Sequence, residues 1–170
     1  PIRIGLCLAA VWLFSAPAVA QDGPLHALFD EFMEFRRHEE PRFAASLDGV
    51  SPASLGSMTE ADIERRDAVV RGFRDRLLEI PHERLSNEDL VHRDVFEAAL
   101  AERLGDVRFG GQFLPINADS GFHIGMARLA NSVPLRTVVD DDGYIALLRD
   151  IPRYFDEHIA PRLMAGDKVF

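Results

Sequence analysis

The spacing of its apolar residues constrains this 170-residue chain more than any other feature of its sequence. Between Pro24 and Glu40, apolar side chains recur at steps of three and four residues, which places them on one face of an α-helix. They are Leu25, Leu28, Phe29, Phe32 and Met33. Pro24 suits a first helical turn, and Pro41 disfavours helical geometry in the residue before it. A helix from Pro24 to Glu40 is therefore predicted.

A loop and a second helix are predicted to follow. The stretch 43–57, "FAASLDGVSPASLGS", contains the glycine, serine and proline residues that are typical of connecting loops. The second helix is predicted to begin near Ser57 or Thr59, with Ser57 as its cap and Glu60 at the capping-box position. Pro81 is predicted to end it.

The third helix is predicted to begin after Ser86, whose hydroxyl can accept a hydrogen bond from a free N–H of the first turn. Gly105 either ends this helix or only interrupts it. The segment Phe109–Ala118, "FGGQFLPINA", has no helical period and is predicted to be an extended connection. The segment 121–134 is a weaker helix candidate, because Gly125 lowers helix propensity by about 1 kcal/mol relative to alanine.

The last part of the chain is predicted to form two helical segments. One runs from Val138 to Arg149, and the other begins past Pro152 and continues to about Ala165. An interior proline removes one hydrogen bond and crowds the preceding turn, so Pro161 predicts a kink or a break. No segment shows the alternating pattern of a β-strand, and the sequence predicts an all-α fold.

The first twenty residues have the features of a secretory signal peptide. They place one cation, Arg3, before an apolar stretch and end in Ala18-Val19-Ala20, a small-residue cleavage pattern. The apolar stretch is shorter than the roughly 20 residues that a bilayer span needs. Residues 1–20 are therefore predicted to be removed, with an uncleaved anchor as the alternative. Residues 21–170 are expected in the periplasm or outside the cell.

The remaining chain has no cysteine, because Cys7 is the only one, so it has neither a disulfide nor a thiol nucleophile. Removal of Arg3 changes the formal net charge from -9 to -10. Such an acidic surface repels phosphate, which argues against a nucleic-acid partner. We also expect no stable insertion into a membrane after cleavage.

Asp140, Asp141 and Asp142 precede a helical segment and have two interpretations. Carboxylates can bind a hard cation, but adjacent residues at a helix start point about 100 degrees apart and do not converge on one ion. Capping the helix and meeting the positive end of its dipole is the simpler role. Arg136, shortly before them, either holds a peptide carboxylate or, as we favour, pairs with Asp140 or a neighbouring acid.

No catalytic, cofactor-binding or metal-binding residue is assigned from local motifs. The six histidines do not form a zinc-binding H-E-x-x-H pair, no G-x-S-x-G turn is present, and "GGQF" lacks the lysine of a phosphate loop. The histidines are His26, His38, His82, His92, His123 and His158. The serines of "SPASLGSM" are interpreted as turn and cap residues, and Phe122, Tyr154 and Phe155 as core or interface aromatics.

Several short elements, taken in order, resemble the N-terminal part of a family of secreted bacterial proteins catalogued as "domain of unknown function 885". These elements are "FAASLDG" at residues 43–49, "LPIN" at 114–117, Gly121, "PLRTV" at 134–138, Tyr144, Pro152, Asp156 and Ile159. Gly143 and Pro161 depart from the family pattern. The resemblance extends through essentially all of residues 21–170.

The resemblance implies a mostly helical protein that is an exported zinc peptidase. Full-length family members are longer and carry an H-E-x-x-x-G-H-H-like motif in their later part, where histidines would hold zinc and a glutamate would activate water. That motif does not occur in these 170 residues. The chain is then expected to be the N-terminal portion of such an enzyme, inactive alone, with the catalytic portion as its partner and a peptide as substrate. The alternative is a free-standing periplasmic helical module for binding or scaffolding.

Overall fold

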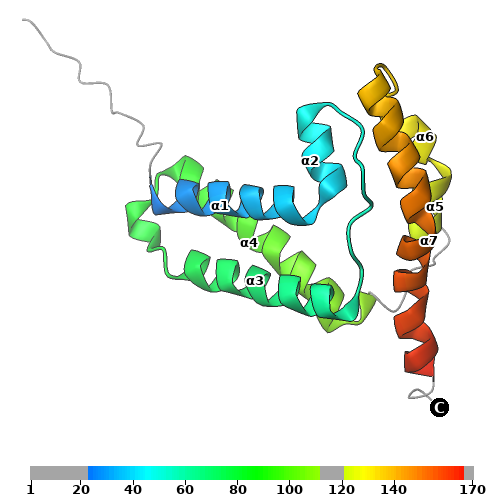
Figure 1. Cartoon of the computed structure of the whole chain (residues 1–170). Coiled ribbons are helices and arrows are strands. Elements are labelled where there is room, and N and C mark those ends of the chain that lie inside the picture. The colour runs from blue at the N-terminus through cyan, green and yellow to red at the C-terminus, as the bar shows by residue number, and fades with distance from the viewer. Residues whose placement is uncertain (1–22, 112–120, 167–170) are drawn as a thin grey trace, which may run out of the picture.

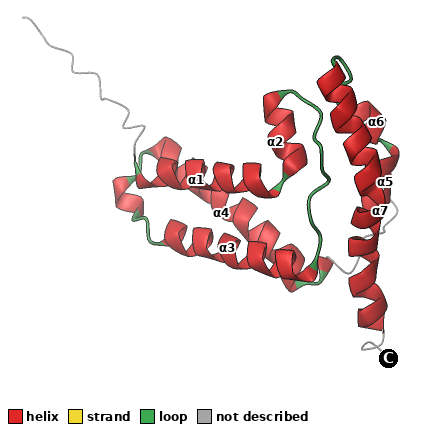
Figure 2. Ribbon diagram, in the orientation of Figure 1, coloured by secondary structure: helices red, strands yellow, loops and turns green. Residues whose placement is uncertain are grey.

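The computed structural model describes residues 23–111 and 121–166, and within this part every regular element is helical (Figures 1 and 2). The predicted all-α class is confirmed. The α-helices are α1 (Pro24–Glu39), α2 (Pro41–Asp48), α3 (Glu60–Leu78), α4 (Asn87–Arg108), α5 (Phe122–Ala127), α6 (Leu129–Ser132) and α7 (Val138–Gly166), with a 3-10 turn at His82–Arg84. The predicted signal peptide, residues 1–20, and most of the predicted extended connection lie outside the described residues.

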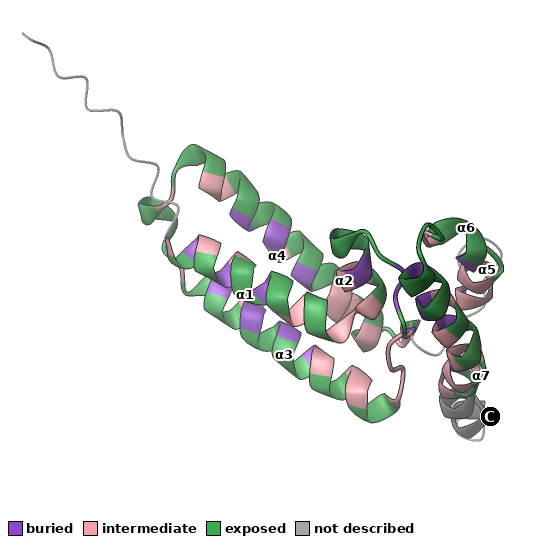
Figure 3. Ribbon diagram, turned by 45° about the horizontal axis from the view of Figure 1, so that its top comes forward, coloured by how far each residue is buried: buried purple, intermediate pink, exposed green. Residues whose placement is uncertain are grey.

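Helices α1, α3 and α4 form an antiparallel bundle in which α3 runs opposite to the other two (Figure 1). Their apolar stripes face one another, so the buried residues lie on the inner faces of the three helices (Figure 3). Phe32 is central: its ring lies edge-on to Phe73 at 5.2 Å and to Phe96 at 5.0 Å, the geometry that aromatic pairs prefer. The buried core is Leu25, Leu28, Phe32, Val70, Phe73, Leu77, Phe96 and Leu100.

The predicted cap of α4 is confirmed, whereas the predicted cap of α3 is wrong. Ser86 Oγ accepts the backbone N–H of Asp89 at 3.0 Å. At α3 the N-cap is Thr59, whose Oγ1 accepts the backbone N–H of Asp62 at 3.2 Å. Ser57 instead donates its hydroxyl to the Asp62 carboxylate. Ser57 lies before the helix, and its backbone carbonyl accepts a hydrogen bond from the Arg66 guanidinium at 2.9 Å.

The predicted loop after α1 is wrong for its first residues, which form α2. Pro41 stops α1 as predicted, but it also occupies the first turn of α2, where its missing N–H is harmless. Gly49 ends α2 with φ 67, a left-handed conformation that glycine adopts without strain. These two residues are the usual start and stop signals of a short helix, and Ala45 fixes it by facing the core.

Two boundaries in the rest of the chain also differ from prediction. Gly105 neither ends nor interrupts α4, which continues to Arg108. The weak helix candidate before Pro134 forms two short helices, α5 and α6, which meet at Arg128.

Helix α7 is continuous, so the predicted division at Pro152 is wrong, and of the kink or break predicted at Pro161 the break does not occur. Residues 49–59, hereafter the linker, run along α7 in the same direction (Figure 1). Ser51 bonds to Asp140 and Met58 bonds to Glu157. The seven residue steps from Ser51 to Met58 span about 23 Å in an extended chain. The seventeen steps from Asp140 to Glu157 span about 25 Å in a helix, so the two lengths match. The linker therefore hydrogen-bonds to α7 both before and after Pro152, which stabilises α7 as one continuous helix.

A second, smaller core joins the linker to the C-terminal helices. Leu55 of the linker is buried with Leu129 of α6 and Leu147 of α7. Tyr144 and Tyr154 pack against these three residues from α7. The linker therefore connects the helical bundle to the second core. It leaves the bundle after α2, runs along α7, and returns to the bundle at α3. Among the described residues, no helix combines the length and the apolar character that a bilayer span requires.

Candidate functional site

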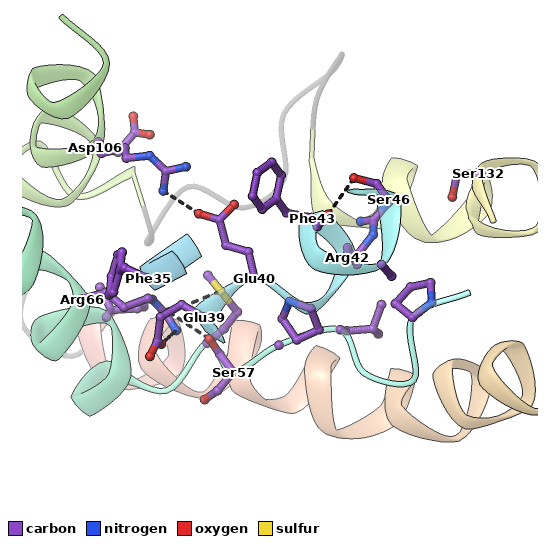
Figure 4. A pocket seen from close by; sticks show the side chains of 18 of the residues that line it. Phe35, Glu39, Glu40, Arg42, Phe43, Ser46, Ser57, Arg66, Asp106 and Ser132 are labelled. Carbon is purple, nitrogen blue, oxygen red and sulfur yellow. Dashed lines mark hydrogen bonds and ion pairs between the residues drawn. The ribbon is translucent and has the colours of Figure 1, made fainter. Parts of the chain in front are cut away.

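A cavity of about 1300 Å³ lies where the bundle, the linker and the C-terminal helices meet. Its wall includes the end of α1, most of α2, the beginning of α3, the end of α4, the linker, and residues around the end of α6 (Figure 4). These segments converge because the linker carries the chain out of the bundle to α7 and back. The cavity is the candidate site, since ligands usually bind in large concave pockets.

Glu39 at the end of α1 is the most completely neutralised acid of the wall. Its side chain is only 8% exposed, and the Arg65 guanidinium donates to both of its carboxylate oxygens at 2.8 and 2.6 Å. This bidentate hydrogen bond holds the pKa of Glu39 below its ordinary value. Glu39 is therefore a structural ion-pair partner that ties α1 to α3.

Glu40 lies beside Glu39 and points into the cavity from the short turn between α1 and α2 (Figure 4). Burial raises the pKa of this carboxyl group, but hydrogen bonds and charge from Arg36 and Arg103 outweigh burial and lower it. Both guanidinium groups lie 2.9 Å from the carboxylate. A general acid or base needs a pKa near the working pH, so Glu40 is poorly suited to proton transfer.

Asp67 and Arg42 differ from these paired groups. Asp67 of α3 is 8% exposed and pairs through Oδ2 with Arg71, while its buried Oδ1 has no hydrogen-bond partner among the described residues. Arg42 of α2 lines the same cavity, and no acid of the described residues forms an ion pair with it. The wall thus includes a buried carboxylate oxygen without a donor and an exposed guanidinium without an ion pair among the described residues.

The serines that line the cavity are hydrogen-bond donors to the protein itself. Ser46 donates to the Phe43 carbonyl, Ser132 to the Leu129 carbonyl, and Ser57 to the Asp62 carboxylate. In the linker, Ser51 donates to the Pro134 carbonyl. Ser54 and Ser57 also accept the backbone N–H two residues on, at 3.1 and 3.4 Å, so the interpretation as turn residues is confirmed for these two, whereas Ser51 makes a long-range bond.

The aspartate triplet has an architectural role: Asp140 caps α7, and Asp141 lies with it in the first turn of that helix. Thr137 Oγ1 accepts the backbone N–H of Asp140 at 3.2 Å, and Asp140 Oδ2 accepts the backbone N–H of Thr137 at 3.1 Å. This reciprocal pair is a capping box at the start of α7. Asp140 Oδ1 also accepts the backbone N–H of Ser51. Burial opposes its ionisation, but these hydrogen bonds outweigh burial and lower the pKa of Asp140.

The favoured pairing of the Arg136 guanidinium with an acid is wrong. The guanidinium donates to the carbonyl of Gly49, and only the backbone N–H of Arg136 bonds to Asp140, at 3.2 Å. The linker start and the segment before α7 are thus joined at one place. We call this contact the junction, and it consists of Gly49, Ser51, Pro134, Arg136 and Asp140.

The histidines are not gathered at one centre. His26 bonds to Asp89 at 2.9 Å and His38 to Glu39 at 3.1 Å, whereas His123 and His158 contact the Phe122 ring. The described residues contain no group of three or more histidine, cysteine, aspartate or glutamate side chains that could hold a metal ion. The zinc that the resemblance implies therefore has no fitting site in this part of the chain, and no catalytic step is assigned to it.

The interpretation of Phe122, Tyr154 and Phe155 as packing aromatics is confirmed, and the Phe122 ring contacts the other two. The Phe122 ring lies 4.7 Å from that of Phe155 and stacks on His158 at 4.4 Å, while Tyr154 meets Phe122 edge-on at 6.2 Å. This cluster fixes α5 against α7. Burial raises the pKa of the Tyr154 hydroxyl.

Sequence reasoning missed the two acids that hold the middle and the end of the linker. Asp150 accepts the backbone N–H of Leu55 at 2.8 Å, and Glu157 accepts that of Met58 at 2.7 Å. Arg153 lies between them and donates to the Gly56 carbonyl at 2.9 Å. No local pattern indicates these contacts, because each joins residues more than 90 positions apart.

No protein-family model, no curated protein and no solved structure matches this chain.

Proposed function

We propose that this chain is the N-terminal part of an exported zinc-dependent peptidase of the family catalogued as "domain of unknown function 885", and that it is inactive without the catalytic portion. The fold, the junction and one surface of α7 support the proposal. The zinc ligands and the water-activating glutamate would come from the catalytic portion. The present chain would supply structure and part of the substrate path.

The junction is the observation that carries the proposal. Two of the elements on which the resemblance depends, residues 43–49 and 134–138, are separated by more than 80 positions in the sequence. They meet through the Arg136 bond to Gly49, and Ser51, two residues after the first element, bonds to Pro134 of the second. Elements that resemble a family only by chance have no reason to be in contact. Their contact supports the interpretation that they form one structural unit.

A surface of α7 supports the expectation of a further portion. Its outward face carries Val138, Ile145, Leu148, Pro152 and Ile159, hereafter the outer α7 stripe, and the four aliphatic residues are 74%, 43%, 45% and 41% exposed. Their steps of seven, three, four and seven residues keep them on one helix face. An apolar stripe of this length is typical of a helix that packs against another element.

The direct test is a peptidase assay on the protein translated from the gene, including any codons that follow Phe170. We expect an in-frame H-E-x-x-x-G-H-H-like motif, peptide cleavage by the purified product, loss of cleavage with a zinc chelator, and recovery when zinc is restored. Cleavage that persists under complete chelation contradicts the metal mechanism. A stop codon directly after Phe170 contradicts the proposed catalytic portion.

A free-standing helical binding module is the second candidate, and the cavity favours it. A site of about 1300 Å³ exists without any contribution from a further domain. The two candidates differ in one measurement. A module that stands alone should unfold cooperatively as a soluble monomer, whereas a chain that needs the catalytic portion should associate through the outer α7 stripe.

A further inference from the structure

The two apolar cores of the described chain share no residue. One lies inside α1, α3 and α4, and the other joins the linker to α6 and α7. Helix α2 belongs with the bundle, because Arg36 of α1 lies over the Phe43 ring at 3.7 Å. Among the residues whose side chains the structure describes, no hydrogen bond, ion pair or ring contact joins α5, α6 or α7 directly to α1, α2, α3 or α4. Within this part of the chain, α5–α7 are therefore attached to the bundle through the linker.

The linker is bound to α7 near its start, in its middle and near its end. Carboxylates of α7 accept the backbone N–H groups of Ser51, Leu55 and Met58. The Leu55 side chain is buried in the second core, and Arg153 of α7 donates to the Gly56 carbonyl. A segment bonded at three separate points and packed between them moves with the helix that holds it. The linker and α5–α7, hereafter the C-terminal unit, therefore form one rigid body.

The linker is hydrogen-bonded to the bundle helices and α2 only at its two ends, among the described residues. At its start, the Val50 N–H donates to the Ala45 carbonyl at 3.0 Å. At its end, the Arg66 guanidinium donates to the Ser57 carbonyl at 2.9 Å. Gly49, at the first of these ends, has φ 67 and covers a wide range of backbone angles without strain. Both ends can therefore absorb a change in backbone angles.

The line between these two ends runs along α7 (Figure 1). Rotation about this line changes backbone angles at the ends and leaves the bonds between the linker and α7 intact. The middle of the linker approaches the bundle side at Gly56, where an added Cβ would lie 3.4 Å from Pro41 Cδ. Since Gly56 lies close to the line, such a rotation displaces it little and this approach is kept.

The cavity provides the space for this rotation. Its volume of about 1300 Å³ lies between bundle residues such as Phe35 and Leu104 and the segment with Val133 and Pro134. Packed interiors resist displacement because their side chains interlock, whereas atoms that face a void lack those contacts. Units of one chain without a large apolar interface are expected to move relative to one another. No packed core therefore fixes the two walls at one separation.

We propose that the C-terminal unit rotates as a rigid body relative to the bundle, with hinges at Gly49 and at Ser57–Thr59, and that this rotation opens and closes the cavity. Hinge movements of this kind place the change in backbone angles in a few residues at the ends of elements. The inference does not depend on the proposed function, because it applies equally to the N-terminal part of a peptidase and to a free-standing module.

The test measures distances between pairs of spin labels in the exported protein by double electron–electron resonance. Cys7 is the only cysteine of the chain and lies in the predicted signal peptide, so introduced cysteines are the only labelling sites. Frozen samples retain the spread of separations, so the width of each distance distribution reports how far the two labelled parts move relative to one another.

Three pairs separate hinge rotation from local flexibility. Glu102→Cys on α4 with Arg149→Cys on α7 spans the hinges. Glu102→Cys with Asp75→Cys on α3 lies within the bundle, and Ala53→Cys in the linker with Asp156→Cys on α7 lies within the C-terminal unit. All five positions are exposed, so unchanged thermal unfolding is expected for each labelled variant.

We expect the distribution across the hinges to be about twofold or more wider than the two control distributions, because only that pair samples the rotation. Three equally narrow distributions would overturn the inference, since the units would then be fixed. A broad distribution for Ala53→Cys with Asp156→Cys would also overturn it, because the linker would not follow α7. If Arg149→Cys lowers the melting temperature, Asp142→Cys, also exposed on α7, takes its place with the same expected result.

Discussion

Asp140 accepts the backbone N–H of Ser51 at 3.2 Å, although the two residues are 89 positions apart in the sequence. Because the same carboxylate caps α7, one side chain both starts the helix and fixes the linker to it. Asp140→Ala removes an acceptor from three backbone N–H groups, so we expect a clear fall in melting temperature, measured by circular dichroism. Asp141→Ala, one residue away and exposed, should change it little. Equal effects of the two substitutions would contradict this assignment.

Gly143 is predicted to resist replacement by alanine even though it lies inside a helix. An added Cβ would lie 2.9 Å from the Ser51 carbonyl oxygen and 3.1 Å from the Ser51 Cβ. This crowding should exceed the gain in helix propensity of about 1 kcal/mol, so Gly143→Ala should destabilise the protein in urea denaturation.

Gly72 of α3 is the matched control for Gly143. Nothing lies within 4 Å of a Cβ added there, so Gly72→Ala should stabilise the protein by about 0.4–1 kcal/mol. Stabilisation by both substitutions would show that Ser51 does not press on α7.

The bundle core should respond strongly to truncation at its centre. Leu77 is 0% exposed and packs in the buried cluster of α1, α3 and α4. Leu77→Ala should cost about 2–5 kcal/mol in the free energy of unfolding, from lost apolar contact and the cavity left behind. Val91→Ala, at a position 60% exposed, should stay within about 0.5 kcal/mol. Similar losses at both sites would show that the bundle does not pack as described.

Stability should depend on acid through Asp62. Hydrogen bonds from Ser57, Thr59 and Arg65 lower the pKa of Asp62 from 3.8 to about 2. Because the folded-state pKa is the lower one, the carboxylate stabilises the fold fully above the unfolded value. This contribution is lost as the pH falls from about 4 to about 2. Asp62→Asn should therefore melt below the wild type at neutral pH, and the two melting temperatures should converge near pH 2.

Asp75→Asn on the same helix is the control for the acid dependence, because Asp75 is exposed. This variant should follow the wild-type curve over the whole pH range. A constant difference between Asp62→Asn and the wild type down to pH 2 would show that ionisation of Asp62 does not support the helix cap.

The outer α7 stripe is tested by two adjacent leucines. Leu148 is 45% exposed and Leu147 is 0% exposed. Leu148→Lys should leave the melting temperature nearly unchanged and reduce association of the chain, measured by sedimentation velocity. Leu147→Lys should unfold the C-terminal helices, because a lysine charge is costly in an apolar core. Unchanged association in Leu148→Lys would argue against docking through this stripe.

Local sequence determined the helices and most of their ends. Apolar residues three and four positions apart identified the inner faces of α1, α3 and α4, and Ser86 marked the start of α4. These signals are readable because helical hydrogen bonds and caps join residues close together in the chain. Asp140 was likewise recognisable as an architectural residue, although its neighbours Asp141 and Asp142 have the same side chain.

Tertiary structure alone decided the course of the linker, the continuity of α7 across Pro152, and the cavity. The linker makes no helix or strand of its own, so its position depends on distant acceptors such as Asp150 and Glu157. Arg42 and Asp67 line the same cavity from different helices, and no sequence pattern predicts that they do. Sequence patterns report interactions within a few turns, whereas these features depend on side chains brought together by folding.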